Sequence, residues 1–535
     1  MQPAGKPILI ITSGAYIDPE LQAEFGRIPP AFLPLGGRHL YLHQYEEFRE
    51  IAERIILSVP ESFICSEYDK LRLVQLNIEL VPVPENLSLG ESIVYVINIS
   101  GISGRSLLLL HGDTLLRDLA KTTPDSLSID TKPLPEYLWG GAVLKDGIVS
   151  VTQKSDSSET NAILTGFFHF SDSSRLVQCV TRANGDFLTG LLKYGEDKSF
   201  RPLYASEWFD FGHAGSYHRS RHKVTTERVF NSLITTHRSV TKTSHERNKI
   251  AAEAQWFENL PDELRLYTPA YLGKSMVDGE LSYSLEYLHL PTLSDVFVFG
   301  RARLAAWKKI FDACNEIIEK MVSYRNSELP NYSFDHFDKT IKRLESYAQQ
   351  FPIDLDTPCR IGKRSLPSLR QMVLAASSII ENTAPGLQTF THGDFCFSNL
   401  LYDSRAGKVF MIDPRAVDFD GKHTAWGDTR YDIAKLHHSV IGLYDHILAG
   451  NYKLDVQGEL EFNLELPSDD YIKAIGAEFL SRSFSFKNAS DHDILGMSVL
   501  LFFSMLPLHS ENRERQMALL ANGMRMFLIL DDFIG

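Results

Sequence analysis

The spacing of apolar runs between Pro7 and Asp113 constrains the fold more than any other feature of the sequence. Four β-type runs, "PILIITSG", "RIILSVP", "IELVPVP" and "SLLLLHGD", are separated by stretches such as "LHQYEEFREIAE", which have the apolar spacing of amphipathic helices. This alternation predicts an α/β domain built on a mainly parallel sheet with helices on both faces. We therefore expect a ligand site in the loops after the carboxyl ends of the strands.

A different pattern begins after about Lys223. A short β-rich patch from Ser232 to Tyr287 precedes long helical periodicity in "RARLAAWKKIFDACNEIIEKMVSY" and "LPSLRQMVLAASSIIENT". A chain of 535 residues is also long enough for two or three domains. We predict an amino-terminal domain at 1–228 and a carboxyl-terminal α+β domain at 229–535, with a small lobe at about 229–290 and a helical large lobe at about 291–535.

Charge and cysteine usage exclude several classes of protein. A formal net charge of −14 argues against a nucleic-acid or membrane-surface role, because polyanionic partners are repelled. The five cysteines form no CxxC pair, which fits a reducing cytoplasm. The apolar run near the start of the sequence is too short for a signal peptide, and the later apolar run "MSVLLFFSMLPL" is too short to span a bilayer. We expect a cytoplasmic protein that binds small molecules, without nucleic-acid or membrane partners, and leave a homo-oligomer open.

Phosphoryl-transfer chemistry is indicated by the segment from Thr391 to Pro414. "THGDFCFSN" contains Asp394 and Asn399, and a following apolar run ends at Asp413 in "VFMIDP". Transfer from a nucleotide needs one carboxylate to orient the attacking hydroxyl, with a second carboxylate and an amide oxygen to hold Mg²⁺. The plainer alternative is that these side chains only cap and turn the chain.

This segment resembles the catalytic loop H-x-D-x-x-x-x-N of kinases, followed by a metal-binding Asp. The glycine in the middle of "HGD", and Ile-Asp in place of Asp-Phe-Gly, make it most similar to the aminoglycoside phosphotransferase and choline kinase family. The resemblance implies a bilobal protein-kinase-like fold that uses ATP and Mg²⁺ or Mn²⁺. It further implies that Asp394 orients the acceptor hydroxyl and that Asn399 and Asp413 hold the metal, while His392 supports the loop.

A second stretch, "WGDTRYDIAKL", is similar to the G-D-x-x-x-D-[IL]-A element of the same family. There the first acidic residue, here Asp428, braces the catalytic loop at the start of a helix. Asp428 and Asp432 are alternatively simple helix caps. His437 and His438 follow on the same stretch with no metal partner at helical spacing, and are expected to be surface or core residues.

The family also implies a lysine on a strand upstream and a glutamate on the next helix. "SVTKTSHERNKIAAEAQWFENLP" supplies Lys242 and Glu253, whose ion pair would fix the ammonium near the α and β phosphates. A solvated surface pair is the alternative. In "YSLEYLHLPTLSD", backbone groups of Glu286, Tyr287 and Leu288 would hold the adenine. No convincing Gly-rich phosphate loop precedes Lys242.

Four motifs occur in order in the first domain: "PPAFLPLGGRHLYLHQ", "SLGESIVYVI", "LLLLHGDTLL" and "EWFDFGHAGSY". They resemble those of a family of nucleotidyltransferases that activate sugar phosphates or phosphocholine, and the resemblance implies a Rossmann-like (GT-A-type) fold. It implies that Gly90 and Ser92 lie in the segment that reads the nucleobase of a second nucleoside triphosphate, CTP or another. Asp113 and Asp210 are the candidates for metal binding and catalysis, with helix capping as the alternative for Asp113.

Two departures from that family concern the triphosphate site. Of the first loop, G-x-G-x-R, only Gly14 remains, with Arg27 as a stand-in for the lost basic group, and Pro30 replaces the usual lysine. Either Arg27, Arg38 or Lys154 supplies the missing cation, or the domain binds nucleotides without turning them over.

These features together predict a bifunctional transferase. Its carboxyl-terminal domain would phosphorylate a hydroxyl on a small metabolite with ATP, and its amino-terminal domain would couple the product to a nucleotide for surface polysaccharide or lipid head-group assembly. One rival is a kinase controlled by a degenerate, nucleotide-sensing amino-terminal domain, and another is an antibiotic kinase. The acidic residues Asp418, Asp420 and Asp428 either attract a cationic amino alcohol or are simply solvated.

Overall fold

The chain is divided into two compact units, Met1–Thr225 and Thr226–Gly535, in the computed structural model. The structure describes residues 5–119, 122–131, 140–152, 160–226, 233–277, 279–325, 336–351, 353–383, 388–418 and 420–534. Lys154, one of the predicted cations of the first domain, lies outside these residues. None of the helices in the described part is both long and apolar enough to cross a membrane.

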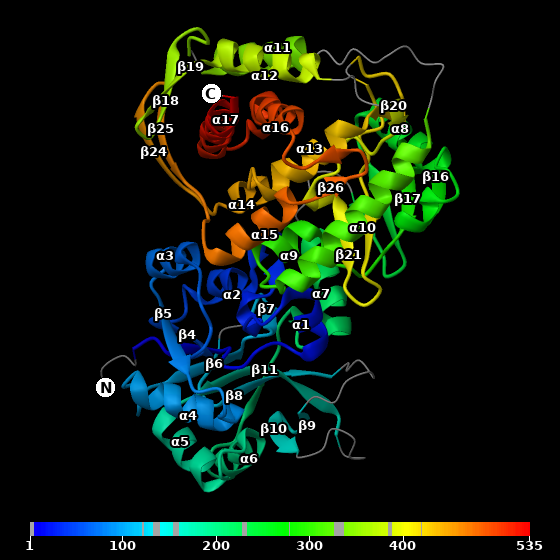
Figure 1. The fold of residues 1–535 in the computed structure, drawn as a ribbon. Coiled ribbons are helices and arrows are strands. Elements are labelled where there is room, and N and C mark those ends of the chain that lie inside the picture. The colour runs from blue at the N-terminus through cyan, green and yellow to red at the C-terminus, as the bar shows by residue number, and fades with distance from the viewer. Residues whose placement is uncertain are drawn as a thin grey trace. The chain divides into compact units, whose positions relative to one another are not determined.

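The first unit is built on a nine-stranded sheet (Figure 1). The strands of this unit are β1 (Ile8–Thr12), β2 (Pro34–Leu35), β3 (Arg38–His39), β4 (Arg54–Pro60), β5 (Ile78–Val83), β6 (Leu107–His111), β7 (Thr114–Arg117), β8 (Ser126–Asp130), β9 (Gly141–Lys145), β10 (Ile148–Thr152), β11 (Ala162–Phe170), β12 (Arg201–Leu203) and β13 (Glu207–Asp210). Along the sheet the order is β10-β9-β11-β6-β1-β4-β5, with β8 and β12 attached beside β11. β6, β1, β4 and β5 run parallel and β11 runs antiparallel to β6. The predicted α/β fold with a largely parallel sheet is confirmed.

Helices cover both faces of this sheet, as the continuous burial of β1 and β6 requires. They are α1 (Pro19–Phe25), α2 (Leu40–Phe48), α3 (Glu67–Gln75), α4 (Leu89–Ile99), α5 (Ser173–Arg182), α6 (Phe187–Asp197) and α7 (Ala214–Thr226). Figure 1 shows α4, α5 and α6 together on one face, and their apolar residues share a core with strands β1, β4, β5, β6 and β11. α4 begins with a capping box, because Ser88 accepts from the Glu91 N–H and the Glu91 carboxylate accepts from the Ser88 N–H.

The second unit starts with a small antiparallel sheet. The strands of the whole second unit are β14 (Leu233–Thr235), β15 (Ser239–Thr243), β16 (Tyr271–Val277), β17 (Glu280–Glu286), β18 (Pro358–Ile361), β19 (Arg364–Ser368), β20 (Gln388–Phe390), β21 (Leu400–Asp403), β22 (Lys408–Met411), β23 (Trp426–Asp428), β24 (Lys453–Gly458), β25 (Glu461–Glu465), β26 (Ser483–Phe484) and β27 (Lys487–Asn488). The first four form the sheet β14-β15-β17-β16, against which the first helix of the unit packs.

The rest of this unit is mainly helical. Its helices are α8 (Arg247–Glu258), α9 (Leu293–Val298), α10 (Leu304–Ser323), α11 (His336–Gln350), α12 (Leu369–Asn382), α13 (Thr429–Val440), α14 (Tyr444–Leu448), α15 (Asp470–Leu480), α16 (His492–Ser504) and α17 (Arg513–Ile534). α16 is buried on every side, because α11, α12, α13 and α17 all pack against it. The hairpin β21–β22 and the pair β20–β23 lie between α12 and α13 in the chain. A small sheet followed by a helical region is the α+β architecture predicted for this part of the sequence.

A second four-stranded sheet, β19-β18-β25-β24, interrupts the helical region and was not predicted. Its strands come from two hairpins about a hundred residues apart, joined where Arg360 and Ile361 of β18 pair with Glu461 and Phe462 of β25. β24 is exposed along most of its length, so it lacks the alternating apolar pattern by which strands are recognised.

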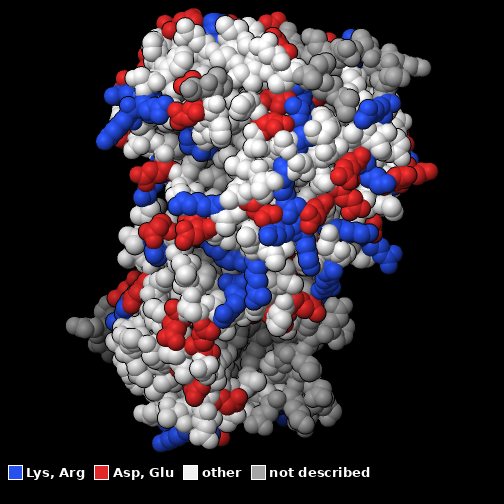
Figure 2. Space-filling view, in the orientation of Figure 1, with Lys and Arg blue, Asp and Glu red and all other residues white. Residues whose placement is uncertain are grey.

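The net negative charge does not produce a uniformly acidic surface. Figure 2 shows Lys and Arg side chains interspersed with Asp and Glu over the face that it draws. Several of these charges are paired, for example Arg482 with Glu478 and Lys320 with Glu263. Local basic regions therefore exist in a chain whose net charge is acidic.

Candidate functional site

The first unit brings Asp113 and Asp210 to one place. Asp113 follows β6, whose carboxyl end lies beside that of β1. Asp210 is the last residue of β13, which pairs with β7 so that Asp210 is opposite Thr114. The N–H of Phe211 donates to the carbonyl of Asp113 at 2.8 Å. Two carboxylates that are almost a hundred residues apart in the sequence thus meet at the edge of the sheet where a ligand is expected.

The electrostatics of this pair suit a divalent cation. Burial raises the pKa of the Asp113 carboxyl, and burial together with the charge of Asp113 raises the pKa of Asp210 to about 6. Asp210 Oδ2 is buried and accepts no hydrogen bond from the residues described. A Cβ atom at Gly212 would lie 2.8 Å from Asp113 Oδ2, so only glycine lets the backbone pass this close. Two converging carboxylates with an unsatisfied oxygen fit Mg²⁺, which commonly takes one or two protein carboxylates and completes its shell with phosphates and water.

Asp113 lies between two pockets of the first unit. One, of about 280 Å³, is lined by Gly14, Pro30 and Ser92 as well as Asp113. The other, of about 420 Å³, is lined by Asp113 and Asp210 with residues from the start of α6. The shared carboxylate means that ligands in the two pockets would meet at Asp113.

Other predicted residues of the first unit lie elsewhere. Gly90 packs against the backbone of Gly185, where an added Cβ would come within 2.3 Å of the Gly185 carbonyl oxygen, so its role here is to let the chain segments approach. Arg27 pairs with Glu85 at 3.1 Å and covers the ring of Tyr16, which lines the smaller pocket. Arg38 pairs with Glu46.

His111 was missed by the sequence analysis although it directly precedes Gly112 and Asp113. Its ring lines both pockets, and its Nε2 atom is buried with no hydrogen-bond partner among the described residues. Burial lowers the pKa of His111 to about 4, so the imidazole is neutral at physiological pH. Its place in the sequence, at the end of a buried strand and beside a candidate metal ligand, is the signal that could have identified it.

In the second unit, Lys242 and Glu253 form a buried ion pair. Lys242 Nζ lies 2.8 Å from Glu253 Oε2 and 3.1 Å from Asp413 Oδ1. Glu253 is only 1% exposed and also accepts a hydrogen bond from the Tyr283 hydroxyl at 2.7 Å. Burial opposes the charge of Lys242, but Asp413 and Glu253 outweigh it and raise its pKa. The alternative of a solvated surface pair does not describe this arrangement.

The segment predicted to hold the adenine begins at the last residue of β17. The Glu286 N–H donates to the Ala270 carbonyl at 2.8 Å and the Leu288 carbonyl accepts from the Leu290 N–H at 2.8 Å. The turn between β14 and β15 contains no glycine and is held by Thr236, whose hydroxyl accepts from the N–H groups of Arg238 and Ser239. The described part of this lobe therefore has an ordinary polar turn before Lys242, in line with the absence of a Gly-rich motif.

Asp394 has a different partner on each carboxylate oxygen. Asn399 Nδ2 donates to Oδ2 at 2.8 Å, and Lys435 Nζ lies 2.7 Å from Oδ1. Burial opposes ionisation of Asp394, but the Lys435 ammonium and the hydrogen bonds outweigh it and hold its pKa below the usual value. His392 donates from Nε2 to the Ile412 carbonyl at 2.9 Å and accepts at Nδ1 from the Asp394 N–H at 3.3 Å. Burial lowers the pKa of its ring. Lys435, on α13, was not predicted as a site residue.

The loop that carries Asp394 is braced by Asp432, which corrects the expectation for Asp428. Asp432 accepts from the N–H of His392 at 3.0 Å and from that of Gly393 at 2.8 Å. Asp428 instead caps α13 and pairs with Arg430 through both oxygens. The reason is helical geometry: Asp428 precedes the helix and faces its first turn, whereas Asp432 lies one turn further on.

Two further contacts position this loop. Gly393 has a φ of 75°, and a Cβ there would lie 2.9 Å from the Arg415 Cβ, which explains the glycine in "HGD". Trp256 on α8 donates through Nε1 to the Thr391 carbonyl at 2.9 Å. The helix that carries Glu253 is thereby tied to the loop that carries Asp394.

The remaining predicted residues shape a turn or lie in the core. Asp418 Oδ1 accepts from the N–H groups of Asp420 and Lys422 and so shapes a turn. His437 and His438 are buried in α13, and the ring of His438 lies 4.1 Å from that of Phe502. They are core residues, one of the two places expected for them.

Replacing Asp432 by Asn tests the brace. The amide keeps one acceptor oxygen but turns an NH₂ group toward a buried N–H, which costs about 1–3 kcal/mol locally. Hydrogen exchange of the His392 and Gly393 amides should therefore become faster in Asp432→Asn. Asp470→Asn, at an exposed position of α15, is the control and should leave that exchange unchanged. Unchanged protection in Asp432→Asn would show that these hydrogen bonds do not hold the loop.

The known proteins to which this chain is similar are solved structures of low sequence identity. No protein-family model and no curated protein matches the sequence. Among solved structures, a nucleoside-diphosphate-sugar pyrophosphorylase from Vibrio cholerae RC9 is 12% identical over 40% of this chain and 100% of its own, with a TM-score of 0.34. The inositol-1-phosphate CTP transferase from T. maritima is 16% identical over 43% of this chain and 99% of its own, with a TM-score of 0.33. A thermostable mutant of aminoglycoside phosphotransferase APH(4)-Ia is 12% identical over 54% of this chain and 87% of its own, with a TM-score of 0.35. Each of these likenesses covers about half of this chain.

Proposed function

We propose that the chain is a bifunctional transferase in which the second unit phosphorylates a small hydroxyl compound with ATP and the first unit transfers a nucleotidyl group to the phosphorylated product. The observation that supports this most directly is that each unit has its own pair of acidic side chains beside a cation or pocket suited to phosphates. The two reactions would be consecutive, because the product of the kinase is the acceptor of the nucleotidyltransferase. A precursor for surface polysaccharide or lipid head-group assembly is the product class that fits such a sequence of steps.

In the kinase unit, Asp394 would orient the acceptor hydroxyl and take its proton. The contact of Lys435 with Oδ1 keeps Asp394 ionised, which a proton acceptor requires. Lys242, fixed by Glu253, would hold the α and β phosphates of ATP. Asn399 and Asp413 would hold Mg²⁺ or Mn²⁺, which supplies charge neutralisation for the transferred phosphoryl group. Backbone groups near Glu286 and Leu288 would contact the adenine.

In the first unit, the two pockets would bind the two substrates. The nucleoside triphosphate, CTP or another, would occupy the pocket lined by Gly14 and Ser92, and the phosphorylated acceptor the one lined by Asp210. Asp113 and Asp210 would hold Mg²⁺, which neutralises charge at the α phosphorus when bound. Asp113 borders both pockets, so it is placed to orient the attacking phosphate against the triphosphate.

A screen of the full chain tests this proposal. ATP and each common nucleoside triphosphate are supplied with polyols, sugars, hydroxy acids and amino alcohols, and the products are identified by mass. A nucleoside-diphosphate conjugate and released pyrophosphate are the expected products. A phosphorylated acceptor without any conjugate would instead support a kinase with a nucleotide-sensing first unit, an alternative favoured by Pro30 at the triphosphate pocket and by the pairing of Arg27 with Glu85.

Glu253→Gln is expected to raise the KM for ATP about tenfold or more, since Lys242 then loses the charge that fixes it and one charge-assisted hydrogen bond. The KM for the acceptor should change much less. Steady-state kinetics with each substrate varied separately give both values. Glu258→Gln is the matched control, because Glu258 lies on the same helix but is exposed. An unchanged KM for ATP in Glu253→Gln would contradict the proposed role of the pair.

A further inference from the structure

Four basic side chains gather around Tyr431, and one of them, Lys435, contacts Asp394. Lys339 and Arg343 are four residues apart on α11, so they lie on the same face of that helix. Lys435 lies on α13, and Arg415 follows β22 by a few residues. Three segments that are distant in the sequence contribute to this group, which we call the cationic cluster.

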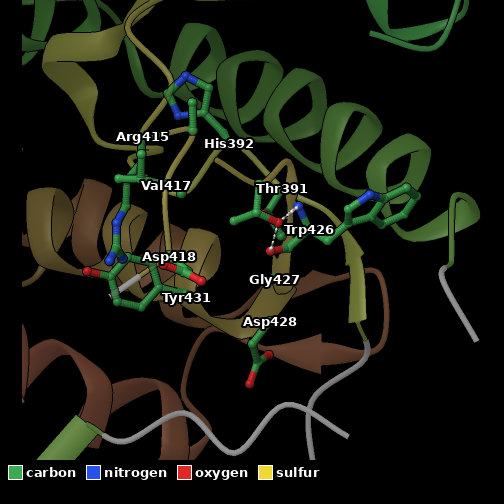
Figure 3. Close-up of a pocket in the computed structure, with 12 residues that line it drawn as sticks. Thr391, His392, Arg415, Val417, Asp418, Trp426, Gly427, Asp428 and Tyr431 are labelled. Atoms are coloured by element: carbon green, nitrogen blue, oxygen red, sulfur yellow. Dashed lines mark hydrogen bonds between the residues drawn. The ribbon is translucent and has the colours of Figure 1, made fainter. Parts of the chain in front are cut away.

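The ring of Tyr431 lies at the centre of the cationic cluster. Lys339 Nζ and Lys435 Nζ are each 5.9 Å from the ring centroid, and the Arg415 guanidinium carbon is 5.7 Å from it. Figure 3 shows the Arg415 side chain extending to the Tyr431 ring at one side of a pocket that His392 and Gly393 also line. Of the cluster, Arg415 lines this pocket, which lies next to the loop of Asp394.

The contacts of Asp394 place the cationic cluster on the side away from the candidate metal ligand. Oδ2 of Asp394 accepts from Asn399, whereas Oδ1 contacts Lys435 of the cluster. Lys242, the candidate cation for the ATP phosphates, is bound by Glu253 and Asp413 instead. The cluster is thus additional to the charges assigned to ATP, and it lies where an acceptor hydroxyl would approach Asp394.

The cationic cluster concentrates like charge in a partly buried place. Burial, followed by the charges of Arg415, Arg343 and Lys435, lowers the pKa of Lys339 to about 5, so this amine is neutral at physiological pH. The positive charge of the cluster is therefore carried by Arg415, Arg343 and Lys435. Arg343 also donates to the Ser504 carbonyl at 2.8 Å, and Lys339 and Arg415 make further interactions within the chain. The argument rests on the summed charge rather than on any free side chain. A bound anion would offset the mutual repulsion, and Arg and Lys are the residues that bind carboxylate and phosphate best.

The acidic residues that also line this pocket do not favour a cationic ligand. Asp428 is paired with Arg430 through both oxygens, and Asp418 shapes a turn by accepting two backbone N–H groups. An acidic site for an amino alcohol, one of the alternatives left open by the sequence, is therefore less well supported than an anion site.

We propose that the acceptor phosphorylated by the second unit is an anionic hydroxy compound, whose carboxylate or phosphate is held by the cationic cluster while its hydroxyl faces Asp394. The inference rests on the proposed kinase function of this unit. In the transfer step, the hydroxyl proton passes to Asp394 as the hydroxyl oxygen bonds to the γ phosphorus. The bond from the γ phosphorus to the bridging oxygen breaks and ADP leaves. The anionic group of the acceptor is unchanged.

Four acceptor compounds of different charge test this proposal on the full chain. D-glycerate and glycerol 3-phosphate represent the carboxylate and the phosphate, glycerol the neutral analogue and choline the cationic one. kcat/KM for the better anion should exceed that for glycerol and choline by about tenfold or more, and Arg415→Gln and Arg343→Gln should each raise the KM for that anion about ten- to a hundredfold. The KM for ATP should stay within about twofold, and Arg415→Lys should recover part of the loss. Lys408→Gln removes an exposed charge of the same unit and should have no effect.

Binding measured by calorimetry at low salt separates failure of this inference from failure of the kinase proposal. Arg415-dependent binding of glycerate or glycerol 3-phosphate without any phosphorylation would support the anion site and contradict the kinase function. Phosphorylation of glycerol or choline with no preference for the anions would leave the kinase and overturn the inference. A rise in the KM for ATP in Arg415→Gln, with the acceptor KM unchanged, would also overturn it, because the cluster would then serve the nucleotide.

Discussion

Asp394→Asn is expected to lower ATP-dependent phosphorylation by about three orders of magnitude, the loss typical of removing a general base. The amide has nearly the same shape but cannot take the proton of the acceptor hydroxyl. It also leaves Lys435 without the carboxylate oxygen that lies 2.7 Å away in the native chain. The rate of phosphoryl transfer, measured as ADP formed with saturating ATP and acceptor, gives the result directly.

Two controls keep this result specific. Asp531→Asn replaces an exposed carboxylate on α17 of the same unit and should retain full activity. Nucleotidyl transfer by the first unit, assayed as pyrophosphate released when the phosphorylated acceptor is supplied, should be unchanged in Asp394→Asn. Retention of more than a tenth of the kinase activity would show that Asp394 is not the proton acceptor.

Asp113→Asn is expected to abolish nucleotidyl transfer, with a loss of about a hundredfold or more, because one of two carboxylates proposed to hold the metal becomes neutral. The same substitution removes one of two buried like charges. In metal-free buffer the variant should therefore be no less stable than the wild type, because in the wild type the charge of Asp113 opposes the ionisation of Asp210. Pyrophosphate release and thermal unfolding, measured on the same preparation, test both parts.

Asp146→Asn is the matched control for this second result. Asp146 is exposed in the turn between β9 and β10 with a φ of 50°, a conformation that Asn also adopts readily. Kinase activity should persist in both variants. Continued pyrophosphate release in Asp113→Asn would exclude the proposed metal site, whereas a large loss of stability would indicate that the carboxylate has a structural role.

Much of the fold was predictable from local patterns. The strands β1, β4 and β6 of the first unit are short apolar runs buried on both faces, and β5 beside them is partly exposed. Such runs give a strong signal without any partner information. The exposed strand β24 gave no such signal, and its hairpin partner β25 joins the rest of the sheet by pairing with β18, about a hundred positions away. The sheet that they form was therefore missed.

The candidate site was partly predictable for a similar reason. Asp394 and Asn399 belong to one loop, so their spacing alone indicates that they can act together. Asp432 and Asp428 show the limit of such reasoning: both are acidic and close to α13 in sequence, and only the helical turn between them determines which one reaches the backbone of His392. Their roles in catalysis and in positioning stay predictions until the variants are measured.

The sequence by itself determined the fold class of this protein and its change of character near residue 225, because these depend on periodicity and on neighbours within a few positions. The acidic residues that it assigns to phosphate chemistry stay a prediction. Tertiary structure alone decided that Asp210 meets Asp113, that Tyr283 supports Glu253, and that Lys435 contacts Asp394. It also gathered Lys339, Arg343 and Arg415 around Tyr431 from separate segments. The physical reason is that electrostatic interactions depend on distance and burial in the folded chain, neither of which is encoded by the separation of residues along the sequence.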